Sequence, residues 1–503
     1  MVQKKGKISE LLKYPAIFFI VVICYMIWRI CMDQVPELVV KLIMASGAAM
    51  CFIVSAMILK RSSSRGEIDA DTVVKLVIIA GIIMRIGYML LTPCDLRGHD
   101  MKEFEINSRG HAAYILNIVE NGSLPGSNRS QFYQQPFFYL LGGGVSWIVN
   151  RLLNCSDVFY IVDAAKTISC AASCMMLMLS EKMCDMLGLG KKGKLAAVTL
   201  TAFVPALFLA CRVNCDALAG LFLTLAFMYT IRWRNYPSWK NTVILAFVYG
   251  CGVMTKISVA VMALFTLIVF IAKLVGVIRK KERSTCVCIM LKYLVFGMIS
   301  LPLGLWYSVR NFIKFQQPLT YVPAPGETSS LFTGDHSLLG RFLFPNIKTM
   351  FERPYIHLKR DYNMFEYSVK TACFGEFKYD IPSVISILLE WAGYVLAVCV
   401  LASVVKIIIR EFTAKKNGRK PEWSMLITIA VCGVFCASLL VFYYRFPYTC
   451  SMDFRYMLFL VAPGAVVLAR YCELCKAQWF RNTVRGSLAV FVLSSCTMFI
   501  WAL

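Results

Sequence analysis

The sequence predicts an all-α polytopic membrane protein: a helical bundle of roughly thirteen transmembrane helices, with interfacial helices and a long outer loop. The first supporting observation is composition. Hydrophobic residues make up 58% of the 503 residues, charged residues only 16%, and the mean hydropathy is +0.65. Such a chain lacks the polar surface of a soluble globular protein. The second is that apolar runs near the length of a membrane span recur along the whole sequence. Because lipid offers the backbone no hydrogen-bond partners, helices are the expected spanning elements.

The distribution of charge predicts the orientation. The net charge is +24, from 53 Lys and Arg residues against 29 Asp and Glu residues. The basic residues are scattered between apolar runs and form no single face, which indicates a positive-inside bias and argues against nucleic acid as a partner. This bias places the N-terminus and the segments 191–194, 279–283 and 410–420 in the cytoplasm, and the C-terminus outside. We expect a multi-pass protein of the plasma membrane, in a bacterium, because no organelle-targeting segment is evident.

The N-terminal segment is expected to add two spans to a larger module. The first apolar run, 14–32, follows a basic stretch but precedes no small-residue cleavage site, so it predicts a retained span. With the second run it forms two additional transmembrane helices in residues 1–71. Residues 72–503 form the main module, with outer loops at 93–157 and 311–380.

The segment 136–153 is apolar but short, and glycines occupy positions 142–144. If it crossed the bilayer, the basic stretch 189–194 would lie outside, so we expect 136–153 to lie at the outer interface. The pattern leaves open whether it crosses.

The first outer loop carries the densest set of ionisable side chains. His99, Asp100, Glu103, Glu105 and His111 all fall between Cys94 and Pro136. A polar loop between spans that carries several carboxylates and imidazoles is a candidate for chemistry, although an ordinary solvated loop has the same charge pattern. The predicted orientation places all four histidines of the chain on the outer side.

Other outer positions place charged residues at the ends of spans. Arg212 and Asp216 flank one predicted turn, Lys256 lies between two apolar helices, and Asp453 and Arg455 begin another span. Arginine suits bidentate binding of a phosphate. The structural alternatives are that Arg212 and Asp216 neutralise each other and that Lys256 extends to the interface.

Several sequence blocks together resemble one family. GHD at 98–100, GHAAYILNIVENGSLP at 110–125 and FYQQPFFYLL at 132–141 resemble the opening module of bacterial GT-C glycosyltransferases. RVNCDALAGLFLTLAF, GVMTK, YNMFEYSVKTACFGEF and CSMDFRYM then resemble later blocks of the same enzymes, in the same order. The resemblance runs from about Thr72 onward. It is to enzymes such as protein O-mannosyltransferases and aminoarabinose transferases, and it implies a GT-C-like fold.

The resemblance also implies a reaction and a set of residues. These enzymes move a sugar from a polyprenyl-phosphate carrier to an acceptor on the extracytoplasmic face, and here Asp100 matches the general base of an inverting transfer. Two departures are that Met101 follows Asp100 where many members have a second acid, and that Gln134-Gln135-Pro136 replaces a frequent His-Pro-Pro. The residues expected to bind substrate are His99, His111, Tyr133, Gln135, Arg212, Asp216, Lys256, Glu376, Asp453 and Arg455.

The expected partners are therefore a polyprenyl-phosphate-linked sugar, the lipid bilayer, and a glycan, lipid or protein acceptor. The sequence identifies neither the sugar nor the acceptor. His99, Asp100, His111 and His336 are ligand types that suit zinc or manganese, but their spacing matches no strong metal motif. We assign no metal ligands, and a divalent metal is compatible with the sequence without being required.

A transporter or lipid flippase of the cell envelope is the alternative interpretation. Arg85, Asp163, Lys166 and Glu390 lie within apolar runs, where ionisable residues often mark a transport path. No internal repeat at half-length is evident, however, and long polar loops on one side favour an enzyme.

Overall fold

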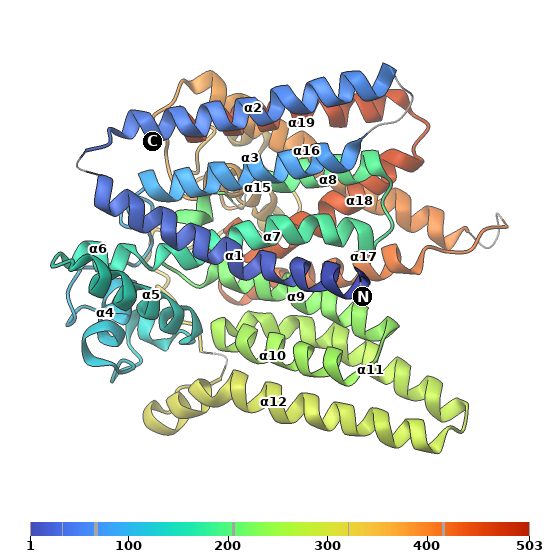
Figure 1. Cartoon of the computed structure of the whole chain (residues 1–503), viewed down its shortest axis with the longest axis horizontal. Helices are drawn as coiled ribbons and strands as arrows, with labels where there is room; N and C mark the ends of the chain where they lie inside the picture. The colour runs from blue at the N-terminus through green and yellow to red at the C-terminus, as the bar shows by residue number, and fades with distance from the viewer. Residues whose placement is uncertain are drawn as a thin grey trace. The chain divides into compact units, whose positions relative to one another are not determined.

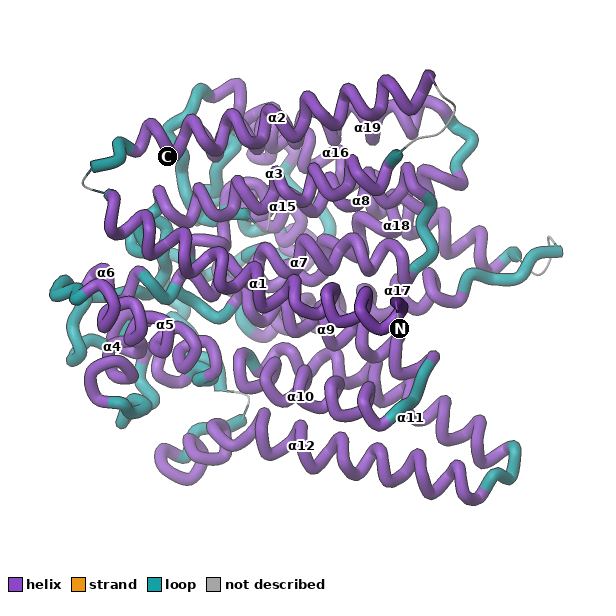
Figure 2. The backbone as a smooth tube through the Cα atoms, in the orientation of Figure 1, coloured by secondary structure: helices purple, strands orange, loops and turns teal. Residues whose placement is uncertain are grey.

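The computed structural model describes residues 2–32, 34–64, 69–203, 207–319, 321–414 and 418–501. Figure 2 shows that helices and loops make up this part of the chain, which contains no strand. An isolated bridge between Phe332 and Tyr448 is the one β-type pairing among the described residues. The predicted all-α class is confirmed.

The chain forms two compact units. The first unit comprises Met1–Pro93, Ser173–Cys211 and Ala324–Leu503, and the second unit comprises Cys94–Ala172 and Arg212–Pro323. Helix α7 (Lys166–Met186) contributes its beginning to the second unit and the rest to the first. The predicted boundary after residue 71, which would separate two N-terminal helices from a main module, stays a prediction.

The first unit holds the N-terminal helices and most of the C-terminal half. Its described elements, besides its part of α7, are α1 (Val2–Cys31), α2 (Glu37–Ser64), α3 (Ala70–Leu91), α8 (Lys191–Ala202), η2 (Phe208–Cys211), α13 (Leu338–Phe342), α14 (Ile347–Glu352), α15 (Met364–Phe374), α16 (Ser383–Phe412), α17 (Trp423–Arg445), η4 (Thr449–Met452), η5 (Phe454–Leu460), α18 (Val461–Leu474) and α19 (Gln478–Trp501).

The second unit holds the first outer loop and the middle of the chain. Its described elements, besides its part of α7, are α4 (His111–Asn121), η1 (Ser130–Tyr133), α5 (Phe137–Leu153), α6 (Val158–Asp163), α9 (Asp216–Asn235), α10 (Trp239–Thr255), η3 (Ile257–Ala260), α11 (Val261–Arg279) and α12 (Arg283–Phe315).

In the described part of the chain, ten helical segments are long and apolar enough to cross a membrane. The chain is thus a multi-pass membrane protein of the predicted kind, with fewer such segments than the thirteen spans expected. The difference lies in α8, α9 and α10, which are not among the ten; α8 has 12 residues and α10 has 17. The segment 136–153, whose crossing the pattern left open, contains the short apolar helix α5 of 17 residues.

In the first unit, α3 packs against α2 and α8, and α16 packs against α18 and α19. A Cβ added at Gly87 of α3 would lie 2.2 Å from the Met44 thioether of α2, so the absence of a side chain allows this close approach.

In the second unit, α10 packs against α9 and α12, and the helices α9 to α12 lie side by side in Figure 1. Small residues again permit the contact. A Cβ added at Gly250 of α10 would lie 2.6 Å from Leu303, and one added at Gly304 of α12 would lie 3.0 Å from Val253. Close glycine-mediated packing is typical of helices in a bilayer, where no hydrophobic force drives helices together.

Candidate functional site

The loop that carries Asp100 is tied to the start of helix α4. The backbone N–H of His111 donates to the Asp100 carbonyl (2.9 Å), and that of Ala112 donates to the Met101 carbonyl (3.4 Å). Gly110, immediately before α4, allows this approach, because a Cβ there would lie 2.1 Å from the Met101 carbonyl oxygen. These contacts place the backbone of the predicted base at the N-terminus of α4.

The Asp100 backbone is itself in an unusual conformation. Asp100 has φ 55° and Lys102 has φ 56°, in the left-handed region that Asp and Asn tolerate better than other non-glycine residues. The Asp100 side chain is exposed. A strained backbone that presents an exposed carboxylate is a feature found at functional sites.

His111 begins a chain of side-chain hydrogen bonds inside the second unit. The His111 Nδ1 lies 2.7 Å from the Tyr139 hydroxyl, which donates to Gln134 Oε1 (3.0 Å). The Cys215 thiol donates to the same amide oxygen (3.3 Å). Because the Tyr139 hydroxyl donates its proton to Gln134, the contact between Tyr139 and His111 has Nδ1 as the donor.

Aromatic rings pack around this chain. The rings of Tyr114 and Tyr139 stack with centroids 3.8 Å apart, and the Tyr114 hydroxyl donates to Tyr307 Oη (3.1 Å). The Tyr307 hydroxyl donates in turn to the Phe132 carbonyl (2.8 Å). Burial, and then the neighbouring Tyr307, raise the pKa of Tyr114 well above its usual value, so Tyr114 stays neutral. This set of rings holds α4, α5, η1 and α12 together.

The predicted binding residues of the FYQQP motif have partners in the same unit. Gln135 is buried and donates from Nε2 to the Ser308 hydroxyl (2.7 Å). The Tyr133 ring meets Tyr321 edge-on, with centroids 5.7 Å apart. Both contacts join the motif to α12 or to the segment that follows it.

Asp216 and Lys256, two further predicted binding residues, form an ion pair. Asp216 is buried at the first turn of α9, and Lys256 lies between α10 and η3 with its side chain 26% exposed. The carboxylate of Asp216 is therefore paired with Lys256, and the alternative that Arg212 and Asp216 neutralise each other stays a prediction. Arg212 is also buried.

The first unit holds Glu376, Asp453 and Arg455 around a tyrosine, whereas the predicted binding residue His99 lies in the second unit. The Tyr367 hydroxyl of α15 donates to Glu376 Oε1 (2.9 Å), and Arg455 Nε lies 3.5 Å from Asp453 Oδ2. Burial, followed by the charges of Glu376 and Asp453, raises the pKa of Tyr367 well above its usual value. A carboxylate oxygen of Glu376 and one of Asp453 lie within 4.8 Å of each other. Glu376, Asp453 and Arg455 are thus brought together.

Two hydrogen bonds fix this group to the helix α15. The Ser368 hydroxyl donates to the Met452 carbonyl (3.2 Å), and the Phe454 N–H donates to Thr371 Oγ1 (3.0 Å). They bind the face of α15 that carries Ser368 and Thr371 to η4 and η5, on either side of Asp453.

Sequence reasoning missed Gln134, Tyr139, Tyr307 and Tyr367, which connect the predicted residues. Gln134 and Tyr139 lie in the same FYQQPFFYLL block as Tyr133 and Gln135, so this block could have identified them as candidate site residues. Tyr307 and Tyr367 lie in helices far along the chain, and only packing brings their hydroxyls to these partners.

The ionisable residues that suggested a transporter are largely engaged in structural contacts. Arg85 donates to the Gly81 carbonyl (2.9 Å) and to the Thr201 carbonyl (3.2 Å) at the end of α8. Asp163 pairs with Lys166 (2.8 Å) and accepts from the Cys94 N–H (2.9 Å). These contacts hold helix ends and a loop in place, so they supply no argument for a transport path.

Comparisons with known proteins find similarity among solved structures alone. No protein-family model matches the chain. No curated protein matches it either. The chain is similar to the crystal structure of the Archaeoglobus fulgidus oligosaccharyltransferase in the apo form, with 12% sequence identity and a TM-score of 0.44. The match covers 85% of this chain and 55% of the archaeal chain, so this chain spans about half the length of that enzyme. A likeness this weak carries no argument about activity.

Proposed function

We propose that the protein is an integral membrane glycosyltransferase of the GT-C type. It moves a sugar from a polyprenyl-phosphate carrier to an acceptor on the extracytoplasmic face of a bacterial plasma membrane. The observation that carries the proposal is the exposed Asp100 carboxylate, held on a strained turn against the first residue of α4. The ordered blocks that resemble GT-C enzymes support it.

The proposed reaction assigns Asp100 the role of general base. The Asp100 carboxylate takes the proton of the acceptor hydroxyl as its oxygen forms a bond to the anomeric carbon. The bond from that carbon to the phosphate oxygen breaks, and polyprenyl phosphate leaves with the electron pair. An exposed carboxylate suits this task because an acceptor hydroxyl can reach it. Inversion at the anomeric carbon follows from the resemblance alone.

Cations are needed where the phosphate departs. Lys256 and Arg212, both in the second unit, are assigned to this anion. Asp216 holds the Lys256 ammonium and so limits its conformations. In the same unit, His99, His111, Tyr133, Gln135 and Asp216 are assigned to positioning the sugar and the acceptor. Substrate binding by Glu376, Asp453 and Arg455 of the first unit stays a prediction from the resemblance.

The test compares wild type with Asp100→Asn, in purified protein given radiolabelled polyprenyl-phosphate sugars. Asparagine tolerates a positive φ at least as well as aspartate, so the variant removes the charge and leaves the turn intact. Glu105→Gln, an exposed acid of the same loop, is the matched control. We expect wild type and Glu105→Gln to release sugar from the lipid, and Asp100→Asn to be slower by about a hundredfold or more.

Two outcomes would count against the proposal. Full turnover by Asp100→Asn would remove Asp100 from the role of base. If wild type releases no sugar from any donor, this result would argue against the glycosyltransferase class and favour transport.

A further inference from the structure

The long loop 311–380 exposes an apolar surface that no described part of the chain covers. Six apolar residues of α13, α14 and the turn between them are between 41% and 70% exposed. We call this surface the loop patch, and its members are Leu338, Leu339, Leu343, Phe344, Ile347 and Phe351. Side chains of this size, gathered on one short segment, mark an interaction surface.

The loop patch is fixed to the end of a membrane helix. Arg341 is 4% exposed, donates to the Tyr443 carbonyl (3.0 Å) and lies over the Tyr443 ring at 4.5 Å. The Thr333 N–H donates to the Pro447 carbonyl (2.8 Å), which follows α17. The patch therefore lies at the level where α17 ends.

Contacts with α16 define the position of the loop patch along that helix. The Phe351 ring lies 4.8 Å from the Trp391 ring and 5.7 Å from the Tyr394 ring, centroid to centroid. A bilayer core needs about twenty helical residues, and the twenty that precede Lys406 begin at about Ser386. Trp391 is thus one to two turns inside the apolar length of α16, and its half-exposed ring suits the aromatic belt at a membrane interface.

Basic residues lie within the patch segment and after it. Lys348, Arg353, Lys359 and Arg360 are exposed, and Glu352, the one acidic residue in the sequence from 348 to 360, pairs with Arg360 (3.0 Å). A short apolar face beside excess positive charge is typical of segments that bind the surface of an anionic bilayer.

We propose that the loop patch is a membrane-binding surface, inserted into the lipid leaflet at the Ser383 end of α16, with Lys348 and Arg353 facing anionic headgroups. The long loop is then held on the bilayer by its own side chains as well as by α16 and α17. This inference does not depend on the proposed glycosyltransferase activity.

The test is photocrosslinking of the full chain in lipid nanodiscs that contain phosphatidylglycerol and phosphatidylethanolamine. p-Benzoylphenylalanine replaces Phe344 in one protein, Ile268 in a second and Glu327 in a third. Ile268 is 55% exposed in the middle of the spanning helix α11 and reports contact with lipid, whereas Glu327 is an exposed polar position of the same loop. We expect lipid adducts at Phe344 comparable with those at Ile268 and at least five times those at Glu327.

The result that overturns the proposal is an adduct yield at Phe344 no greater than at Glu327, while Ile268 is labelled. Adducts that join two chains of this protein would assign the patch to self-association and would also overturn it. The role of anionic headgroups is tested in nanodiscs that contain phosphatidylcholine alone. There the yield at Phe344 should fall severalfold while that at Ile268 is unchanged, and equal yields in both lipids would remove the role of anionic headgroups.

Discussion

At the scale of single residues, the most unusual feature is a buried charged cluster in the first unit. Lys370 is 1% exposed, and its Nζ lies 3.2 Å from Asp361 Oδ2 and 3.1 Å from Glu366 Oε1. Glu390 is also 1% exposed and lies within electrostatic reach of Lys370. One ammonium cannot neutralise three buried carboxylates, so a carboxyl group of this cluster must hold a proton near neutral pH.

The burial of the Glu366 carboxyl group has a measurable consequence for the stability of the protein. Burial raises the pKa of Glu366 from 4.5 to about 7, and Lys370 only partly opposes the shift. Because the folded pKa exceeds the unfolded one, the contribution of Glu366 to stability is complete below pH 4.5 and is lost as the pH rises to about 7. Glu366→Gln keeps the neutral form at every pH.

We therefore expect the melting temperature of wild type, measured in detergent, to fall relative to Glu366→Gln between pH 5 and pH 8. The total change is at most about 3 kcal/mol, from the size of the pKa shift. Glu352→Gln is the control, because its side chain is 49% exposed and should change the pH dependence little. Parallel melting curves for wild type and Glu366→Gln would show that Glu366 does not carry the buried proton.

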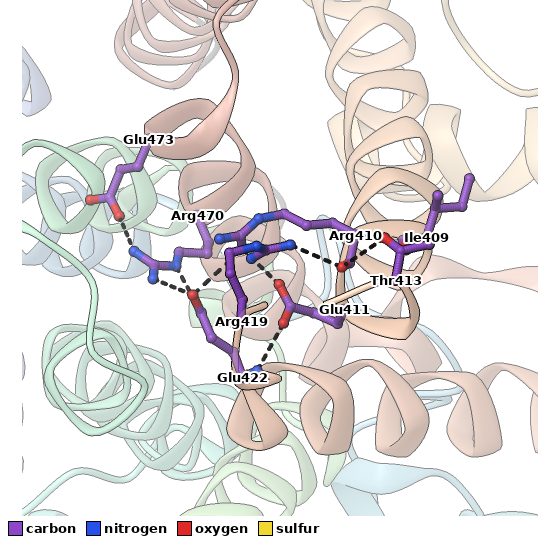
Figure 3. Close-up of polar contacts among 8 residues, drawn as sticks. All are labelled: Ile409, Arg410, Glu411, Thr413, Arg419, Glu422, Arg470 and Glu473. Carbon is purple, nitrogen blue, oxygen red and sulfur yellow. Dashed lines mark hydrogen bonds and ion pairs between the residues drawn. The ribbon is translucent and has the colours of Figure 1, made fainter. Parts of the chain in front are cut away.

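At the scale of elements, a network of charges joins two turns of the first unit through the helix α18, and Figure 3 shows its central part. The Arg470 guanidinium of α18 binds both carboxylate oxygens of Glu422, at 3.0 and 2.6 Å, and donates to Glu473 Oε2 (3.0 Å). The hydrogen bond from Arg470 lowers the pKa of Glu422. Glu473 Oε1 in turn accepts from the Gly190 N–H (2.9 Å), which precedes α8. The turns before α8 and α17 are thereby connected through α18.

Gly193 of α8 provides a test of this network. A Cβ at Gly193 would lie 2.3 Å from Glu473 Oε1, so Gly193→Ala must displace that carboxylate from the Gly190 N–H. We expect a loss of about 1–2 kcal/mol of stability in the wild-type background, because overpacking and a lost charged hydrogen bond outweigh the better helix propensity of alanine.

In the Glu473→Ala background the clash is absent, and the same change should stabilise the protein by up to about 1 kcal/mol. The melting temperatures of wild type, the two single variants and the double variant measure the coupling between Gly193 and Glu473. The interpretation fails if Gly193→Ala has the same effect with and without Glu473.

At the scale of the whole molecule, orientation in the membrane decides whether Asp100 faces the proposed substrate. The positive-inside bias predicts that the loop 311–380 is outside and that the basic segment 410–420 is cytoplasmic. We expect alkaline phosphatase inserted after Gly326 to be active, and green fluorescent protein inserted after Gly418 to be fluorescent. The reverse pair of results would place the loop 311–380 in the cytoplasm and would contradict the predicted orientation.

The membrane class and the helical elements were determined by the sequence alone. Hydropathy over about twenty residues is a local property, and a bilayer permits few spanning structures, so composition and run length were sufficient. The candidate residues Asp100, Glu376 and Arg455 also came from local blocks. The number of spans was predicted less accurately, because α8, α9 and α10 are shorter or less apolar than the helices around them.

The partners of those residues were decided only by the tertiary structure. Asp216 pairs with Lys256 across 40 residues of sequence, and the hydroxyl of Tyr139 lies between His111 and Gln134. In a helix that is apolar on every side, periodicity does not show which face meets a neighbour. Close packing of small and large side chains selects that face, and with it the few polar groups that meet inside each unit.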